Sequence, residues 1–230
     1  MIPKIIHYCW FGEKEKPEEV LRMIASWKKH CPDYEIKEWN ESNFDIHLNR
    51  YTEEAYQQKK WAFVSDVARL WALVHEGGIY MDTDVEVVRP LDDLLTNSGF
   101  LGFEGTQWIA TSIMGVEPQH PLMKQFLSLY EKRSFIQPDG SLQQTTNVEV
   151  WTQLLSKQYG LLLNGEKQQI AGFTIYPTDY FTPYDYINGK LKQTANTYSI
   201  HWFGQSWVGH KDWRRKISQW WHRICGIQMK

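Results

Sequence analysis

The sequence predicts an α/β fold with a mixed, mainly parallel sheet flanked by helices. Short apolar runs of strand length alternate with segments of helical periodicity along the first half of the chain, which is typical of a sheet covered by helices on both faces. The 230 residues are 42% hydrophobic, enough for one sizeable core, and the length favours one domain over two. No internal repeat or low-complexity linker divides the chain.

Strand and helix signals follow one another in a regular order through the first half. Four apolar residues recur at helical spacing after Pro17: Val20, Leu21, Ile24 and Trp27. Gly77 follows a long helical pattern and is suited to end it, because glycine adopts the left-handed conformation at helix ends without strain. In chain order we expect a strand at 4–12, a helix from Pro17, a strand at 34–39, helices at about 52–59 and 60–76, and a strand at 79–81.

The second half continues the alternation less regularly. In chain order we expect strands at 100–105 and 108–115, helices at 120–130 and 148–157, and late strands at 173–177 and 198–203. These elements complete the one α/β domain that the length favours.

Composition and charge exclude several classes of function. The net charge is −2, so no basic field predicts nucleic-acid binding. Twelve tryptophans suit sugar or base stacking as well as core packing. Cys9, Cys31 and Cys225 form neither a zinc motif nor a disulfide framework, which suits a reducing compartment. With no signal-peptide pattern and no apolar run of about 18 residues, we expect a cytoplasmic protein.

Asp82 and Asp84 stand one residue apart at the carboxyl end of the predicted strand 79–81. Side chains two apart on a strand point to one face, and ligands of open α/β sheets bind at this end of the strands. Adjacent carboxylates repel each other, and a hard cation such as Mg²⁺ or Mn²⁺ relieves the repulsion while also binding phosphate oxygens. The two acids equally suit a turn that caps the next segment, and a lone D-x-D favours that interpretation.

The helix before this strand carries two charged residues near its apolar side. In the pattern 61–78, Asp66 falls inside the apolar arc, and Arg69 lies at its edge one turn later. A carboxylate on a core-facing stripe needs a partner or a function. Either the two residues form a structural ion pair at i, i+3, or both reach a ligand site from beneath the next strand, and periodicity leaves both open.

The combined pattern resembles a known family. The stretch A-x-x-S-D-x-x-R, followed by G-G-I-Y-x-D-x-D, resembles the DXD sugar-binding region of glycosyltransferase family 32. The resemblance extends to I-P-K-I-I-H-Y-C-W-F-G at the N-terminus, to 26–27, to 32–45 and to H-W-F-G-Q-S-W, and spans most of 2–207. It implies a Rossmann-like GT-A fold over 1–209 and a retaining, metal-dependent hexosyltransferase similar to short bacterial enzymes of capsule and surface-polysaccharide synthesis.

The resemblance also implies roles at the donor site. Asp82 and Asp84 match the acids that bind the metal, Mn²⁺ or Mg²⁺, together with the donor's ribose and diphosphate. Asp66 and Arg69 match residues that contact the hydroxyl groups of the donor sugar. The implied donor is a nucleotide sugar, with UDP-sugars first because the closest motif matches use them and GDP-mannose as an alternative.

Four further residues match the donor pocket or its cover. Tyr80 matches a residue that lines the pocket, and Trp10 matches an aromatic residue that stacks on the nucleobase. Trp10 ends the first predicted strand, at the sheet edge where ligands bind, although a core position is the alternative. Ser206 and Trp207 match residues that close over the diphosphate.

A histidine can complete a metal site that is built from two carboxylates. His201 lies on the predicted strand 198–203, and a neutral imidazole can join carboxylates around a metal. In related GT-A enzymes a C-terminal histidine or polar residue completes the site, so we expect His201 to be the third ligand, with a core histidine as the alternative. His7 and His75 are expected to be structural.

The catalytic residue is the least defined part of the site. No G-x-x-x-x-G-K-[ST] loop is present, so a metal is expected to neutralise most of the charge on the leaving diphosphate. Retention requires a double displacement or an attack on the same face, and retaining glycosidases use two carboxylates about 5 Å apart. Glu104, Gln144 and Asn147 are candidates, and the sequence does not decide among them.

Residues 210–230 are expected to form a separate basic and aromatic helix. Its apolar positions are Trp213, Ile217, Trp220, Trp221 and Ile224, with Arg214, Arg215, Lys216 and Arg223 around them. This composition suits peripheral contact with an anionic membrane, which would fit a lipid-linked glycan acceptor, and it also suits packing on the domain or an oligomer contact.

Two other classes of function remain as alternatives. A phosphatase of the haloacid dehalogenase type also ends a strand with D-x-D, but it requires Thr or Val where Glu86 stands, and its motif usually opens the chain. A non-catalytic carbohydrate-binding protein could use the tryptophans as sugar platforms, but it would need neither Asp66 and Arg69 nor a metal.

Overall fold

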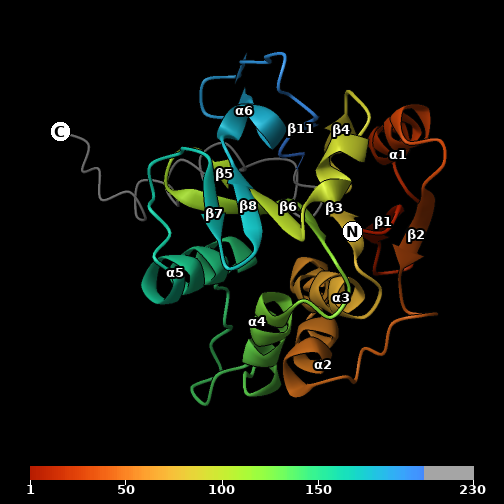
Figure 1. The fold of residues 1–230 in the computed structure, drawn as a ribbon. Coiled ribbons are helices and arrows are strands. Elements are labelled where there is room, and N and C mark those ends of the chain that lie inside the picture. Colours follow the sequence, from red (N-terminus) through yellow and green to blue (C-terminus); the bar gives the residue numbers. More distant parts are fainter. Residues whose placement is uncertain (205–230) are drawn as a thin grey trace.

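The computed structural model describes residues 1–204, which form a mixed seven-stranded sheet flanked by helices (Figure 1). The strands lie in the order β2 (Glu35–Trp39), β1 (Ile5–Cys9), β3 (Gly78–Met81), β6 (Trp108–Val116), β5 (Gly99–Glu104), β8 (Phe173–Tyr176) and β7 (Gln168–Ile170). Only β6 and β7 run against the other strands of this sheet, so it is mainly parallel, as the sequence predicted. The carboxyl ends of β1, β3, β5 and β8 therefore share one edge.

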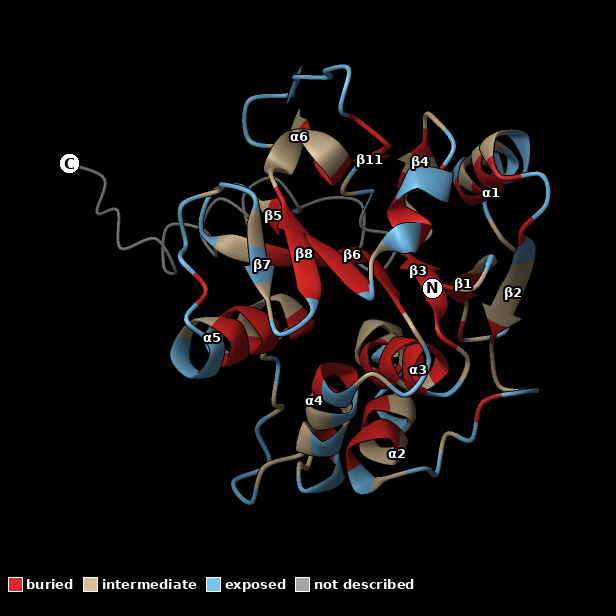
Figure 2. Ribbon diagram, viewed as in Figure 1, coloured by how far each residue is buried: buried red, intermediate tan, exposed pale blue. Residues whose placement is uncertain are grey.

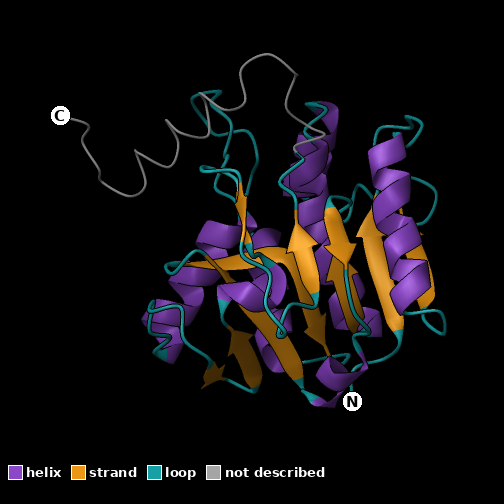
Figure 3. Ribbon diagram, turned by 90° about the horizontal axis from the view of Figure 1, so that it is seen from above, coloured by secondary structure: helices purple, strands orange, loops and turns teal. Residues whose placement is uncertain are grey.

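Helices cover both faces of the sheet (Figures 1 and 3). On one face α3 (Trp61–Glu76) and α5 (Asn147–Tyr159) contact the strands, while α2 (Arg50–Gln57) and α4 (Pro121–Glu131) pack against α3. On the other face lie α1 (Glu18–His30), the short 3₁₀ helix Asp92–Thr96, α6 (Thr178–Phe181) and a small sheet of β4 (Val85–Val87) and β11 (Ser199–His201).

The two faces of the sheet have separate apolar cores, and the inner strands β1, β3, β6, β5 and β8 are buried between them (Figure 2). Strand β3 shows the alternation that divides them. Tyr80 packs in the cluster with α3, whereas Ile79 and Met81 pack in the cluster with Trp27 of α1. Because successive side chains on a strand point to opposite faces, this buried strand contributes to both cores.

The turn from α3 into β3 depends on Gly77 and Gly78. Both have positive φ, at 67° and 94°. A Cβ on Gly77 would lie 2.6 Å from Cδ of Pro118, and one on Gly78 would lie 2.7 Å from the carbonyl oxygen of Ile5. The backbone therefore requires glycine at both positions, on conformational and steric grounds.

His7 of β1 supports the turn between α3 and β3. The imidazole is fully buried, its Nδ1 accepts a hydrogen bond from the indole of Trp39 (3.1 Å), and its Nε2 lies 2.8 Å from the carbonyl oxygen of Gly77. The first contact makes Nε2 the protonated nitrogen, which then donates to Gly77. His7 thus ties β1, β2 and β3 together, in keeping with the structural role predicted for it.

The structure differs from the prediction mainly in short elements. Leu21, predicted on the apolar face of α1, is 52% exposed. Strands β4 and β7, helix α6 and the hairpin of β9 (Tyr184–Asp185) and β10 (Lys190–Leu191) were not predicted, because two to four residues are too few to show a period.

Other predictions concern the chain termini and the cysteines. The predicted helix 210–230 lies outside the described residues. Cys9 and Cys31 are buried free thiols. In the part of the chain that the structure describes, no helix is both long enough and apolar enough to span a bilayer.

Candidate active site

Asp82 and Asp84 lie on a turn directly after β3, not on the strand itself. The amide of Asp82 donates to the carbonyl oxygen of Ser112 (2.8 Å), and the amide of Val85 donates back to the carbonyl oxygen of Asp82 (3.1 Å). The reasoning from strand alternation was therefore wrong in its detail. The carboxylates converge nonetheless, because the turn brings them to the same side as His201. One ligand atom from each of Asp82, Asp84 and His201 lies within 4.8 Å of the others.

His201 reaches this turn through the small second sheet. Strand β11 pairs antiparallel with β4, and His201 stands opposite Val85. Its Nε2 lies 3.3 Å from Oδ1 of Asp84, while its buried Nδ1 has no hydrogen-bond partner among residues 1–204. The amide of Gly204 donates to the other oxygen of Asp84 (2.9 Å). A strand distant in sequence therefore supplies the third potential ligand.

Arg69 links α3 to the same cluster. Its Nη2 lies 3.3 Å from Oδ1 of Asp66 and 3.2 Å from Oδ1 of Asp82. Its Nη1 donates to the carbonyl oxygen of Thr111 (2.8 Å) and its Nε to that of Ser65 (3.2 Å). The structural interpretation of the Asp66–Arg69 pair is thus confirmed, because the i, i+3 contact forms, and the pair also borders the acidic turn, while contact with a ligand stays a prediction. Arg69 positions Asp82.

Tyr80 lies beneath Asp82 and is almost fully buried. Its hydroxyl donates to Oδ1 of Asp82 (2.9 Å), and the guanidinium carbon of Arg69 lies 4.4 Å from the centre of its ring. Asp82 is therefore held by Arg69 and Tyr80, while Asp84 is held by His201 and Gly204. The two acids cannot move independently of these two networks.

Burial and close charges shift the ionisation of this cluster. Burial raises the pKa of Asp82, and Asp84 adds to the rise while Arg69 opposes it. Burial also disfavours ionised Asp84, but His201 and the Gly204 amide bring its pKa below the usual value. For His201, burial disfavours the charged form, but Asp84 raises the pKa to about 9. A protonated imidazole therefore balances the acids here, and a divalent cation could take its place.

The donor set fits such a cation. Carboxylate oxygens suit Mg²⁺ and Mn²⁺, and an imidazole nitrogen suits first-row transition metals. A metal bound between the three side chains would relieve the repulsion between Asp82 and Asp84 and could take the Nε2 of His201, which faces Asp84, as a ligand. This is the group that the sequence predicted to hold a metal, and the structure brings all three residues together.

Asp66 lies on α3, almost fully buried, and burial raises its pKa to about 7 despite the opposing charge of Arg69. Asn147 supports it from the N-terminal end of α5. The Asn147 amide donates to the backbone carbonyl of Asp66 (3.0 Å) and its oxygen accepts from the hydroxyl of Tyr130. Asn147 is 1% exposed, so the structure places this candidate below the site as a support. Gln144 is exposed, in the loop before α5.

Trp10 follows β1 at the carboxyl edge of the sheet and is only partly buried. Its indole N–H donates to the carbonyl oxygen of Lys14 (2.6 Å), and the ammonium of Lys16 lies 6.0 Å from the ring centre. It is therefore not a core tryptophan, although base stacking stays a prediction. Ser206 and Trp207 lie outside the described residues.

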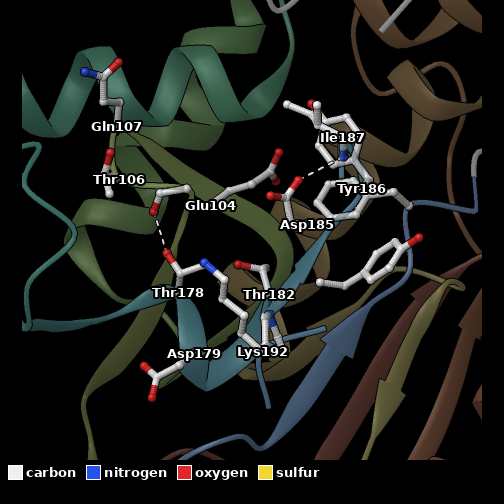
Figure 4. Close-up of a pocket in the computed structure, with 14 residues that line it drawn as sticks. Glu104, Thr106, Gln107, Thr178, Asp179, Thr182, Asp185, Tyr186, Ile187 and Lys192 are labelled. Atoms are coloured by element: carbon white, nitrogen blue, oxygen red, sulfur yellow. Dashed lines mark hydrogen bonds between the residues drawn. The ribbon is translucent and has the colours of Figure 1, made fainter. Parts of the chain in front are cut away.

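Glu104 ends β5 at the same edge and lines a cavity of about 500 Å³ (Figure 4). Its carboxyl group is half-buried, and burial raises its pKa. Glu104 is thus a candidate for a catalytic residue that the structure places on a cavity. Sequence reasoning missed the backbone groups of Thr111, Ser112 and Gly204, because a main-chain donor or acceptor leaves no signal in the sequence.

Comparisons with known proteins agree with this geometry. Residues 17–101 match the family described as "Glycosyltransferase sugar-binding region containing DXD motif". Inositol phosphoceramide mannosyltransferase 3 of Schizosaccharomyces pombe is 30% identical over 136 residues, which are 54% of this chain and 36% of that protein. Mannosyl phosphorylinositol ceramide synthase SUR1 of Saccharomyces cerevisiae is 30% identical over 147 residues, 59% and 37% of the two chains.

The chain thus spans well under half the length of these two relatives, which are fungal enzymes and not bacterial capsule enzymes. Among solved structures, "PaToxG Glycosyltransferase" resembles the chain with a TM-score of 0.54 and 22% identity, over 68% of this chain and 70% of that one. This likeness concerns the fold alone, which is the GT-A glycosyltransferase fold that the sequence predicted.

Proposed function

We propose that the protein transfers a hexosyl group from a nucleotide sugar to an acceptor hydroxyl, with a divalent metal held by Asp82, Asp84 and His201. One observation carries this proposal. Two acids of the β3–β4 turn and a histidine more than a hundred positions later converge within 4.8 Å, at the edge where the parallel strands end. A GT-A fold and a match to a DXD sugar-binding region support the same function.

Different residues would bind different parts of the nucleotide-sugar donor. Trp10 would stack on the nucleobase at the end of β1, and Asp66 would accept a hydrogen bond from the donor sugar. Arg69 and Tyr80 would keep Asp82 in place. A bound Mn²⁺ or Mg²⁺ would supply Lewis acidity to the departing diphosphate.

The transfer itself balances without a further reactant. The acceptor oxygen bonds to the anomeric carbon, the bond from that carbon to the diphosphate oxygen breaks, and the electron pair leaves with the nucleoside diphosphate. The acceptor proton passes to a departing phosphate oxygen. We infer retention of the anomeric configuration, through attack on the same face, from the resemblance to glycosyltransferase family 32.

The donor and the acceptor are the finer parts of the proposal. We propose a UDP-sugar as the donor, on the strength of the motif resemblance, and a glycan or lipid-linked glycan of a bacterial surface polysaccharide as the acceptor. The names of the fungal relatives favour a mannosyl donor and an inositol phosphoceramide acceptor. GDP-mannose is therefore the alternative donor, and an inositol phosphoceramide is the alternative acceptor.

Nucleotide binding in the presence of metal tests this function directly. We expect UDP or GDP, but not both, to stabilise the protein in a fluorescence melting assay with Mn²⁺ and not with EDTA. A ligand at 100 times its Kd adds about 2.7 kcal/mol, and each kcal/mol raises the Tm of a chain of this size by about 2–4 °C. Asp84→Ala should abolish the shift.

Asp139→Ala is the matched control, because Asp139 is exposed in a turn and its carboxylate bonds only Ser141 within residues 1–204. This variant should keep the full shift. No stabilisation by either nucleotide would contradict the proposal and favour a carbohydrate-binding protein. Hydrolysis of simple phosphate esters without nucleotide preference would instead favour a phosphatase.

A further inference from the structure

The cavity beside Glu104 is built by segments that the donor-binding residues do not use. Its walls come from the end of β5 and the turn 105–107, from the α6 region 178–183, and from the β9–β10 hairpin (Figure 4). Phe203 closes one side, and its ring centre lies 3.9 Å from that of His201. The cavity therefore borders the proposed metal group through Phe203 and through Glu104, whose charge interacts with that of His201.

Two charged side chains of the lining form no hydrogen bond or ion pair at contact distance within residues 1–204, although longer-range charge couples Glu104 to His201 and Lys192 to Asp185. The other two carboxylates are engaged at the rim. Asp185 accepts from Asn188 and from the amide of Ile187. Glu104 and Lys192 are thus the charged groups that remain available to a ligand.

The rest of the lining has the composition of a carbohydrate site. The lining includes the aromatic residues Tyr184, Tyr186 and Phe203, and aromatic rings are surfaces against which the C–H face of a sugar can pack. Thr106 and Thr178 add hydroxyl groups on the opposite wall. A cavity of about 500 Å³ lies within the range that holds small ligands, and one sugar ring with part of a second fits such a volume.

The charge of the lining selects against an anionic ligand. Glu104, Asp179 and Asp185 place three carboxylates around the cavity, and within residues 1–204 Lys192 is the single basic residue of its lining. A phosphate would meet three like charges and one opposite charge, and like charges close together cost several kcal/mol in a recognition site. An uncharged ring can instead donate hydroxyl protons to Glu104 and accept a hydrogen bond from Lys192.

We propose that this cavity is the acceptor subsite and that it takes an uncharged sugar ring, whose hydroxyl groups bind Glu104 and Lys192, in preference to a phosphorylated ring. The assignment rests on the proposed transferase function, because it places the acceptor on the other side of Phe203 from the metal group. It selects an uncharged glycan over an anionic headgroup.

The test measures how donor turnover divides between acceptor and water. With the donor that the nucleotide assay selects, release of nucleoside diphosphate and formation of glycoside are measured together. The probes are methyl α-mannopyranoside and methyl β-galactopyranoside, against mannose 6-phosphate and galactose 6-phosphate. We expect the wild-type protein to transfer to at least one methyl glycoside at least tenfold faster than to either phosphate.

Two variants then probe the cavity. Hydrogen bonds to charged groups contribute about 1.5–3 kcal/mol, and 1.4 kcal/mol is tenfold. Glu104→Gln and Lys192→Met should therefore each lower the ratio of transfer to hydrolysis by about tenfold or more and raise the KM for the glycoside. Glu131→Gln and Lys157→Met are the matched controls, because both residues are exposed and have no ion pair within 1–204.

The possible failures are distinguishable. No metal-dependent nucleotide binding and no donor hydrolysis by the wild-type protein would overturn the transferase function and the subsite with it. Donor hydrolysis without transfer to any methyl glycoside, equal use of the phosphorylated sugars, or unchanged ratios in both variants would overturn the subsite alone.

Discussion

The proposed metal site with its supporting residues, here called the metal edge (Asp66, Arg69, Tyr80, Asp82, Asp84 and His201), differs from the neighbouring cavity in how its charged side chains are paired. At the metal edge Arg69 is shared by Asp66 and Asp82, and Asp84 is paired with His201. In the cavity, Glu104 and Lys192 form no ion pair at contact distance with any described residue, and their charges act on His201 and Asp185 only at longer range. Paired charges hold a fixed geometry in the absence of ligand, whereas unpaired charges stay available for a partner that arrives from solution. The contrast separates residues that build a site from residues that select its ligand.

The backbone shows the same contrast. The metal edge rests on the 16-residue helix α3 and on β3, with the turn held by Gly77, Gly78 and His7. The cavity rests on a four-residue helix, α6, and on the two-residue strands β9 and β10. Side chains held by core helices and strands are positioned more accurately than side chains on exposed loops and hairpins. We therefore expect variants at the two sites to differ in stability as well as in activity.

Removing Arg69 should have the largest effect. In Arg69→Met the carboxylates of Asp66 and Asp82 lose their shared partner while they remain buried. Breaking a buried ion pair by removing one partner costs about 3–5 kcal/mol. Urea unfolding, with fluorescence of the tryptophans as the signal, would measure this loss. Arg22→Met is the control, because Arg22 is exposed on α1 and forms no ion pair in 1–204. A loss equal to that of the control would mean that the network does not stabilise the fold.

The metal edge could be predicted from sequence to a greater extent than the cavity. Four of its charged residues lie within 66–84, where the i, i+3 spacing on a helix predicts the Asp66–Arg69 contact and the closeness of Asp82 and Asp84 in sequence keeps both in one turn. His201 required the family resemblance, because the pairing of β11 with β4 is invisible to local periodicity. The lining of the cavity comes from 104–107, 178–192 and Phe203, and only the folded chain brings these segments together.

The support of the metal edge should also respond to pH. Burial is the main cause that lowers the pKa of His7 from the ordinary value of 6.5, so the unfolded chain takes up a proton at a higher pH than the folded chain does. The stabilisation from neutral His7 is therefore complete above pH 6.5 and is lost as pH falls toward the folded pKa. One proton changes stability by at most about 1.4 kcal/mol per pH unit.

His7→Gln isolates this contribution. The free energy of unfolding of the wild-type protein minus that of the variant, measured between pH 8 and pH 5, should be constant above pH 6.5 and shrink below it. Protonated His7 cannot accept the hydrogen bond of Trp39, which is the structural cause. If the difference stays constant down to pH 5, burial does not lower the pKa of His7 in the folded protein.

The smallest effect on stability is expected for a variant in the cavity, Lys192→Met. This variant gives the clearest test of the difference between the cavity and the metal edge. Lys192→Met removes an exposed ammonium that has no ion pair among the described residues, so the free energy of unfolding should change by no more than about 0.5 kcal/mol. The same variant should lower transfer to an uncharged glycoside by about tenfold. Arg69→Met, measured in the same unfolding assay, should show a much larger loss in the free energy of unfolding than Lys192→Met. A loss of more than about 1 kcal/mol in Lys192→Met would mean that its charge is structural, and the cavity would then resemble the metal edge in holding its charges paired. Stability retained together with lost transfer would show that this charge is kept for a ligand.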